Sequence, residues 1–385
     1  MAESKEPRHR VSVICDQQQI AGWTEYEISS SMIEAADAFT MRRPFDPTSW
    51  NTLRRDARVR VFIDGAPILD GFIDKRTKRS PDGTLEISGR DRSGRLVQES
   101  APRINYQGLE LTEAVRRLAD PWFTKVTLSD ARNRTLRMGK NAKRVPGTTD
   151  PIIVKRAASG NGKVQPGQMR WAVIAELVSQ AGLIAWSSAD GKELFVGRPN
   201  NTQAPSFHIL KAKGSVSGSQ STCISLTQDE DNGDRYSLIA CVGSGGGTDV
   251  DFGIRVSSRR AYVTDNEDNI EDGTGRDFQY PKRLLLPEKQ FDSNDDAARV
   301  AGREQMRRDF RRLTFSAEMP YHGQWITPGA ATLFAPNTVA MITDEDHDPI
   351  LEEDGMIYAC SYRRSRSSGE TTQLDMVPTG TEIVL

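Results

Sequence analysis

The sequence predicts a mainly β protein with an α+β insert, and three observations support this fold class. Alternating apolar residues run through residues 9–100 and again from Leu313 to the C-terminus, with Asp-Gly pairs between several runs. Two amphipathic helical patterns lie within residues 101–200. The end of the chain also repeats an order of features found near its start. We therefore expect two related antiparallel β-barrels in one chain, separated by the insert.

Length and composition place the chain among soluble globular proteins. With 385 residues it is too long for one ordinary core, so two or three domains are expected. Hydrophobic residues make up 37% and charged residues 27% of the chain, which excludes the disordered and membrane-embedded classes. Because 51 basic side chains stand against 53 acidic ones, net charge identifies no partner.

The cysteines and the N-terminus indicate assembly in a reducing compartment. Cys15, Cys223, Cys241 and Cys360 lie far apart without C-x-x-C spacing, so reduced, buried thiols are expected. The first ten residues are charged and lack the apolar region of a signal peptide, and no run of 18 apolar residues occurs. We expect no export by the usual secretory route.

Changes in composition divide the chain into four segments. The expected division is an N-terminal tail over 1–8, a first β-barrel over 9–100, an α+β insert over 101–200, and a second β-barrel over 201–385 that carries a helix at 293–312 and long loops.

Hairpins and helices can be predicted within these segments. Asp64-Gly65 and Asp82-Gly83 stand between apolar runs, and Asp-Gly is a strong hairpin signal because both turn positions adopt positive φ. In the insert, apolar residues at helical spacing predict helices around 109–120 and 169–183, with Gly182 as a C-terminal cap. The basic, Gly- and Pro-rich stretch 137–167 between them is expected to be a long exposed loop.

The repeat is visible in the order of features. Near the start, an apolar strand and an acidic turn precede Asp70-Gly71-Phe72-Ile73, which is followed by a basic strand and another hairpin. Near the end, the same order leads to Asp354-Gly355-Met356-Ile357 and a second basic strand. Turn chemistry shared by any two hairpins could produce this match by chance, but the matching basic strands favour duplication. Two similar barrels per chain would allow a trimer to form a ring of six similar units.

Glycine spacing in Gly89-Arg90-Asp91-Arg92-Ser93-Gly94-Arg95 resembles a phosphate-binding loop. The Lys and the hydroxyl residue that such a loop requires are replaced by Arg95 and Leu96, and Asp91 would repel phosphate. We therefore predict a strand end and a turn, and interpret Arg90, Asp91 and Arg95 as candidates for contact with a neighbouring subunit. The run "VGSGGGT" also lacks the third glycine of a dinucleotide fingerprint.

Catalytic and metal-binding patterns are weak in this sequence. The turn "DEDHD" at 344–348 offers carboxylates and His347 to a cation, but without a second cluster a solvated turn is the favoured interpretation. The four histidines are scattered, and neither G-x-S-x-G nor H-E-x-x-H occurs. We expect no enzymatic activity, no cofactor and no metal.

Arginines recur along the helix expected at 293–312, which Ser293 and Asp296 would cap. A spacing of four residues would form a ridge of guanidinium groups, which we interpret as a candidate protein interface rather than a DNA-reading surface. A solvated face that pairs with carboxylates of its own helix is the alternative. The ridge consists of Arg299, Arg303, Arg307 and Arg311.

Four long stretches resemble the baseplate hub proteins of Mu-type contractile phage tails, which are related in fold to the hub part of type VI secretion spikes. They are "GWTEYEISSSMIEAADAFTM", residues 59–100, residues 169–199 and residues 323–377. The Gly-Phe-Ile-Asp strand followed by Ser-Gly-Arg-Asp is the most specific piece. The residues that carry the resemblance, or that shape the strands around it, are Trp23, Gly71, Asp74, Gly89 and Gly355.

The resemblance implies a structural role in the tail baseplate of a virion assembled in the host cytoplasm. It implies a homotrimer whose tube-like barrels form a pseudo-six-fold ring, with the tail tube on one face, the central spike on the other, and other baseplate proteins around it. Tape measure and DNA would pass through the lumen, and no membrane contact is implied. Because the sequence ends at Leu385, soon after the second expected barrel, we expect no lysozyme-like or β-helical extension of the kind found in spike-fused relatives. The alternative hypothesis is a tail-associated carbohydrate-binding or wall-degrading enzyme that uses the turn at 344–348 or the acidic stretch 265–275.

Overall fold

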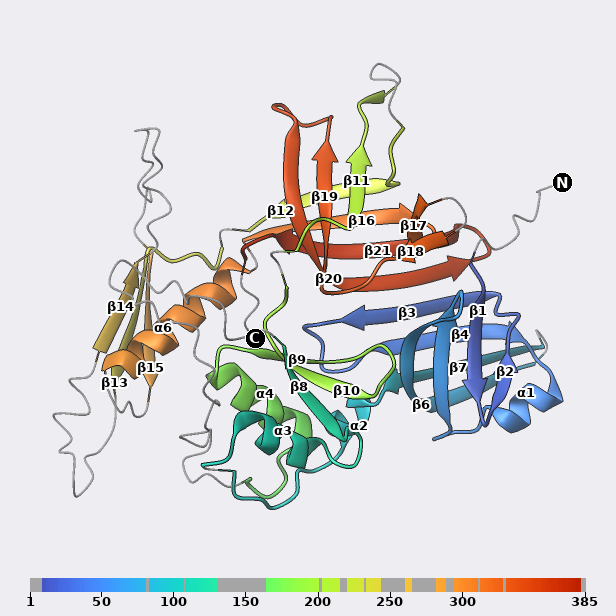
Figure 1. Ribbon diagram of the computed structural model, residues 1–385, viewed down its shortest axis with the longest axis horizontal. Helices are drawn as coiled ribbons and strands as arrows, with labels where there is room; N and C mark the ends of the chain where they lie inside the picture. Colours follow the sequence, from blue (N-terminus) through green and yellow to red (C-terminus); the bar gives the residue numbers. More distant parts are fainter. Residues whose placement is uncertain are drawn as a thin grey trace.

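The fold is described from a computed structural model (Figure 1). The described residues are 9–80, 83–106, 108–129, 164–200, 203–214, 220–231, 233–243, 260–264, 282–288, 294–310, 312–327 and 330–381.

The first unit is a set of antiparallel strands with one short helix, α1 (Pro47–Thr52), whose first turn is capped by the Asp46 carboxylate. The turn predicted at Asp64-Gly65 is present between two of these strands, and both residues have the positive φ that such a turn requires, 51° and 83°. The strands are β1 (Val11–Cys15), β2 (Gln18–Ile20), β3 (Glu25–Ser31), β4 (Ala38–Pro44), β5 (Arg58–Ile63), β6 (Ala66–Arg79) and β7 (Thr84–Asp91).

The insert follows directly and has a small core of its own. Both predicted helices are present, and Gly182, with φ of 69°, follows the last turn of the second. The strand order is β8-β10-β9, and the helices pack on this sheet. The elements are α2 (Ser93–Gln98), α3 (Leu111–Ala119), β8 (Lys125–Ser129), α4 (Arg170–Gln180), β9 (Ile184–Ser187) and β10 (Glu193–Gly197). Most of the expected loop at 137–167 lies outside the described residues.

The second unit extends to the C-terminus. Its strands are β11 (Phe207–Lys211), β12 (Ser225–Glu230), β16 (Leu313–Pro320), β17 (Gly323–Thr327), β18 (Ala330–Leu333), β19 (Thr338–Asp344), β20 (Leu351–Ser365) and β21 (Gly369–Pro378). Between β12 and β16 the chain forms a separate layer at the left of Figure 1, in which α6 (Asn294–Asp309) covers β13 (Leu238–Gly243), β14 (Arg260–Thr264) and β15 (Arg283–Glu288). The acidic stretch 265–275 lies outside the described residues.

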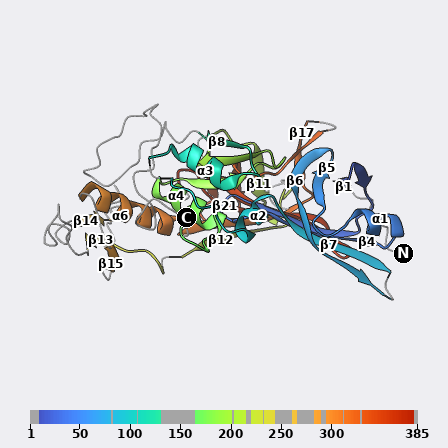
Figure 2. The same cartoon turned by 90° about the horizontal axis from the view of Figure 1, so that it is seen from below.

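The expectation of two closed barrels needs correction. Apart from β17 and β18, which pair with each other, the strands of both units form one 13-stranded sheet. Its main path runs β12-β16-β21-β20-β3-β4-β7-β6-β5-β1-β2 and stays open at both ends. The view turned by 90° shows the same sheet from below, with the β6–β7 hairpin projecting at one end (Figure 2). Sheet closure requires a partner for each outer edge, and the described part of the chain offers none.

The repeat predicted from the sequence is present in the strand pairing. In both units a long strand changes partners at a bulge: β6 leaves β5 near Ile73 and continues on β7, and β20 leaves β19 near Ile357 and continues on β21. Phe39 and Phe315 occupy matching register positions on β4 and β16. The equivalent strands are β3 and β12, β4 and β16, β5 and β19, β6 and β20, and β7 and β21.

Candidate assembly interface

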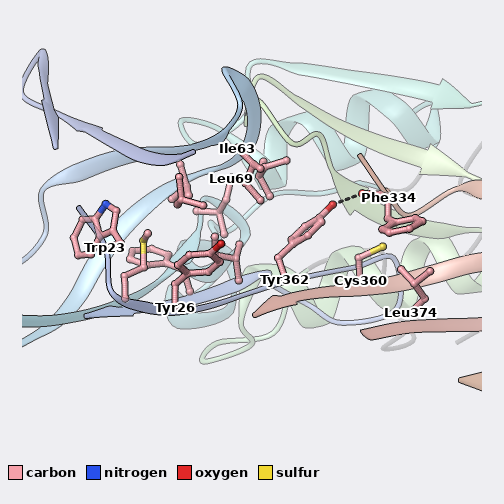
Figure 3. Packing of buried hydrophobic residues seen from close by; sticks show 14 of the residues in the cluster. Trp23, Tyr26, Ile63, Leu69, Phe334, Cys360, Tyr362 and Leu374 are labelled. Carbon is pink, nitrogen blue, oxygen red and sulfur yellow. Dashed lines mark hydrogen bonds between the residues drawn. The ribbon is translucent and has the colours of Figure 1, made fainter. Parts of the chain in front are cut away.

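One strand pair joins the two units, and we call it the internal joint. β3 of the first unit pairs antiparallel with the second half of β20, with Tyr26 opposite Arg364 and Ser31 opposite Ala359. The buried side of the joint carries Ile28 and Tyr362, and the hydrophobic core there takes residues from both units (Figure 3). The two repeats therefore share one core across a continuous sheet.

Two ionisable groups buried on this side of the joint, Tyr362 and Cys360, are neutral. The Tyr362 hydroxyl donates to the Phe334 carbonyl, and burial raises the pKa of Tyr362 well above its usual value (Figure 3). Burial likewise raises the pKa of the Cys360 thiol. All four cysteines are free and buried, as the sequence predicts.

A buried histidine connects β3 to the second unit. The Thr372 hydroxyl donates to the Tyr321 carbonyl at 2.8 Å, so it can only accept from His322 Nδ1, which lies 2.9 Å away. His322 Nε2 then accepts from the Tyr26 hydroxyl at 2.7 Å. Burial first, and the neighbouring His9 second, lower the pKa of His322 to about 3, so the ring is neutral and fits this arrangement.

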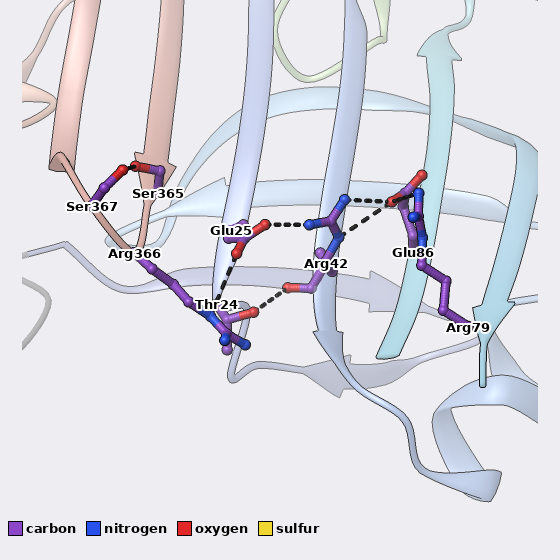
Figure 4. A network of polar contacts seen from close by, with 8 residues as sticks. All are labelled: Thr24, Glu25, Arg42, Arg79, Glu86, Ser365, Arg366 and Ser367. Atoms are coloured by element: carbon purple, nitrogen blue, oxygen red, sulfur yellow. Dashed lines mark hydrogen bonds and ion pairs between the residues drawn. The ribbon is translucent and has the colours of Figure 1, made fainter. Parts of the chain in front are cut away.

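On the exposed side, a chain of ion pairs crosses the joint and continues over the first unit (Figure 4). Glu25 on β3 binds Arg366 beyond β20 at 3.4 Å and Arg42 on β4 at 2.6 Å. Arg42 also binds Glu86 on β7 at 2.8 Å, and its hydrogen bond lowers the pKa of that carboxyl group. Arg79 on β6 completes the chain at 3.4 Å from Glu86. A separate pair, Arg363 with Glu27 at 2.9 Å, spans the joint itself.

The three candidates from the glycine-spaced segment lie at the end of β7, where the first unit meets the insert. Arg90 Nε binds Asp74 at 3.0 Å, and Arg95 binds Asp56 at 2.9 Å while stacking 4.7 Å above Phe72. Asp91 is buried, accepts from the Ser187 hydroxyl of the insert at 2.5 Å, and has a pKa raised to about 6 by burial. The contacts of Asp91 and Arg95 join the first unit to the insert, whereas the Arg90 pair lies within the first unit. A role between subunits stays a prediction.

The same segment ends a strand, as predicted. Gly89 lies within β7, opposite Phe39 and Ile73, so the first glycine is not part of a loop. β7 ends at Asp91, and the six-residue helix α2 begins at Ser93. The sequence did not predict this helix.

The described arginine side chains of α6 contact groups of this chain. α6 begins at Asn294, directly after the expected cap Ser293. Arg303 donates to the Ser179 carbonyl at 2.7 Å, and Arg307 lies 3.7 Å from Glu304 on its own helix. The side chain of Arg299 and all of Arg311 lie outside the described residues. An interface on this ridge stays a prediction.

Trp23, Gly71, Gly89 and Gly355, which the sequence analysis expects to shape the strands, lie at closely packed positions. Trp23 is buried and donates to the Ile20 carbonyl at 3.2 Å. A Cβ on Gly71 would lie 2.0 Å from the Arg90 carbonyl oxygen, and one on Gly89 would lie 2.0 Å from that of Phe72. A Cβ on Gly355, the equivalent of Gly71, would lie 2.6 Å from the tip of the Ile342 side chain and 3.4 Å from the Met376 Cβ.

The acidic turn at 344–348 is tied to its own backbone. Asp344 accepts from the Asp346 amide at 3.0 Å, and His347 Nδ1 contacts the Pro349 carbonyl at 2.8 Å. Among the residues that the structure describes, no three His, Cys, Asp or Glu side chains are placed to hold a metal ion. Within the same residues, no helix has the length and apolar character needed to cross a membrane.

The fold is shared with several solved phage tail proteins. The chain superimposes on the tail protein from Neisseria meningitidis MC58 with a TM-score of 0.73 and 18% identity, covering 97% of both chains. It superimposes on the 43 kDa tail protein of prophage MuSo2 from Shewanella oneidensis with a TM-score of 0.69 and 17% identity, covering 97% of this chain and 100% of that one. For the prophage tail protein gp18 from Listeria monocytogenes EGD-e the values are 0.54 and 10%, with 96% and 95% covered.

Residues 10–91 match the family "Mu phage baseplate assembly protein GpP-like, N-terminal". This match covers the first unit and confirms the resemblance to Mu-type baseplate proteins predicted from the sequence. Among curated proteins, no sequence matches the chain.

The sequence did not single out the acidic residues of the joint. Glu25 and Glu27 alternate with Tyr26 on β3, and the basic strand with Arg363 was noticed only as part of the repeat. The acidic residues of β3 and the basic residues of β20 were the signal in the sequence. Because strand order is not encoded locally, the sequence did not show that these two strands are neighbours.

Proposed function

We propose that the chain is the structural hub of a contractile phage tail, or of a related injection device. It forms a homotrimeric ring that adapts the six-fold tail tube to the three-fold central spike. The observation that carries this proposal is the internal joint, in which one repeat is already docked edge to edge on the other.

In this proposal, one chain serves two symmetries. Each copy supplies two similar units, so three copies supply six around one axis. A contact that joins unlike ends of identical copies must either close into a ring or continue as a filament. A ring of three copies has three-fold symmetry. Because each copy supplies two similar units, the wall of the ring has approximate six-fold symmetry.

The partners follow from this role. The tail tube stacks on one face, the central spike binds the other, and further baseplate proteins surround the ring. Tape measure and DNA pass through the lumen, and the protein is part of the virion after assembly in the host cytoplasm. The family match of the first unit and the shared fold of the phage tail proteins support this proposal. The role is structural, and no catalytic step is assigned.

The experiment is a measurement of mass in solution followed by electron microscopy of assembled tails. Sedimentation equilibrium should give three times the chain mass of 42.8 kDa. Microscopy should place the ring between tube and spike. A protein that stays monomeric at high concentration and is missing from purified tails would contradict the proposal.

A further inference from the structure

The two outer edges of the long sheet are unpaired within the described part of the chain. The strands that run along the sheet in Figure 1, in the order β12-β16-β21-β20-β3-β4-β7-β6, are two consecutive copies of the same four-strand set. β12 bonds only β16, on one side. Beyond the bulge, residues Lys75–Arg79 of β6 bond only β7, on one side. An unpaired edge of this kind offers free backbone groups to another strand.

These edges are the same kinds of strand that form the internal joint. β12 is the equivalent of β3, and the outer part of β6 is the equivalent of the outer part of β20. β3 and β20 pair with each other inside the chain. We infer that β12 of one copy pairs antiparallel with Lys75–Arg79 of a second copy, reproducing the internal joint between subunits. This inference rests on the proposed ring and specifies the contact that closes it.

The repeat also fixes the register. The bulges align Lys75 with Ala359, and the ladders through β4 and β16 align Glu25 with Ser225. Transferring the pairing of Glu27 with Arg363 then puts Thr227 opposite Arg79. One face of the intersubunit pair has Thr227, Asp229 and Asp231 opposite Arg79, Thr77 and Lys75. The other face has Gln228 and Glu230 opposite Lys78 and Arg76.

Charge complementarity supports this occupant. β12 and the next residue carry Asp229, Glu230 and Asp231 in succession, all exposed. The β6 edge carries Lys75, Arg76, Lys78 and Arg79. In the proposed register Asp229 lies diagonally between Lys75 and Arg79, within reach of both long side chains. The internal joint contains the precedent, because Arg363 binds Glu27 across it at 2.9 Å.

The same charges determine how copies meet. Two β6 edges would bring like positive charges together, and two β12 edges would bring like negative charges together, which disfavours a two-fold dimer through either edge. Only the unlike edges are compatible, so contact runs head to tail, as a ring requires. The intersubunit joint is also more polar than the internal one, where the equivalents of Arg76 and Lys78 are the buried Cys360 and Tyr362.

The test is cysteine cross-linking at the proposed register. Thr77→Cys combined with Asp229→Cys places two thiols directly opposite on antiparallel strands, where a disulfide can form. Oxidation should give a covalently closed trimer on a non-reducing gel. The four native cysteines are buried and provide a quiet background. The matched control, Thr77→Cys with Gln228→Cys, puts the second thiol on the other face of the sheet and should not cross-link.

Each outcome has one meaning. Cross-linking of the first variant alone supports the inference. Cross-linking of the control alone means a shifted register and overturns it. A trimer by sedimentation in which neither variant cross-links overturns the edge pairing and leaves the proposed ring intact. Failure of the unmodified protein to form any trimer overturns the proposed function together with the inference.

Charge reversal gives an independent measurement. Asp229→Lys and Lys75→Asp should each weaken trimer formation by about tenfold or more, because each creates a like-charge contact across the edge. The two changes together should recover most of that loss. Glu352→Lys is the control, since this exposed residue lies on the half of β20 that pairs with β19, and it should leave the trimer unchanged. Equal weakening by the control, or no recovery in the double variant, would contradict the edge contact.

Discussion

At the scale of single residues, two equivalent glycines face different neighbours. The space at Gly71 is closed by the backbone of β7, whereas the space at Gly355 is closed by the flexible end of the Ile342 side chain. Backbone cannot move without breaking a ladder, but a side chain can change rotamer. Two positions that match in sequence therefore tolerate a methyl group very differently.

We expect Gly71→Ala to lower the free energy of unfolding by about 3 kcal/mol or more, and Gly355→Ala by about 1 kcal/mol. Urea unfolding followed by circular dichroism checks this. The second variant is the matched control for the first. Equal losses at the two positions would contradict the difference in crowding.

The carboxyl group of Asp91 titrates in an unusual range. Burial raises its pKa from 3.8 to about 6, and the pKa of the neighbouring buried Asp37 is also raised, chiefly by burial. The folded protein therefore binds protons that the unfolded chain has released between about pH 4 and pH 6. Stability from this pair is present in acid and is lost as the pH rises through the folded pKa.

Asp91→Asn should remove part of this dependence. Between pH 4 and pH 7, the unfolding midpoint of the unmodified protein should fall relative to that of the variant, because each pKa unit corresponds to about 1.4 kcal/mol. The measurement is urea unfolding of both proteins at several pH values. Parallel profiles over this range would show that Asp91 ionises as easily in the fold as outside it.

At the scale of elements, the link between β3 and the second unit depends on one buried hydroxyl. Tyr26→Phe leaves the acceptor nitrogen of His322 without its donor in a buried site. We expect a loss of about 1–3 kcal/mol in the free energy of unfolding, with the fold retained. Thermal unfolding measures the loss, and Tyr321→Phe, at a less buried ring, is the comparison. A midpoint unchanged from the original protein would mean that water replaces the missing hydroxyl.

Sequence patterns predicted individual elements well because those signals are local. The Asp64-Gly65 turn, the helices at 111–119 and 170–180, and the repeated Asp-Gly strand were all present in the chain order. Closure of each barrel was predicted wrongly, since it depends on which edges meet. The importance of β3 and β12 comes from their places in the sheet, since β3 joins the two units and β12 forms an outer edge. No local sequence pattern determines this order of strands.

At the scale of the whole molecule, the two repeats do not form separate cores. The central core includes Val61 and Ile87 of the first unit together with Ala340 and Leu374 of the second. A division at residue 100 therefore cuts through shared apolar packing. The insert keeps a core cluster of its own, and the division of the chain into domains stays a prediction.

We expect residues 9–100 expressed alone to be unstable. Without β20, the β3 edge and the apolar side chains under it become accessible to water and to other chains. Analytical gel filtration and amide hydrogen exchange should show aggregation or weak protection. A monomeric fragment with protection equal to that of the full chain would contradict a shared core.

The outer extensions of the two repeats differ where the inner strands agree. β1 runs antiparallel to β5, but its counterpart in position, β11, runs parallel to β19. In the proposed ring, the wall formed by the two equivalent four-strand sets of each chain would present six similar surfaces to a neighbouring protein. The outer strands β1 and β11 would alternate around the ring, one antiparallel and the other parallel to its neighbour. A partner that contacts these strands would therefore meet only three equivalent positions. In the proposed ring, one chain with two similar repeats would thus present six similar sites to the tube and three to the spike, because the repeats differ in their outer strands.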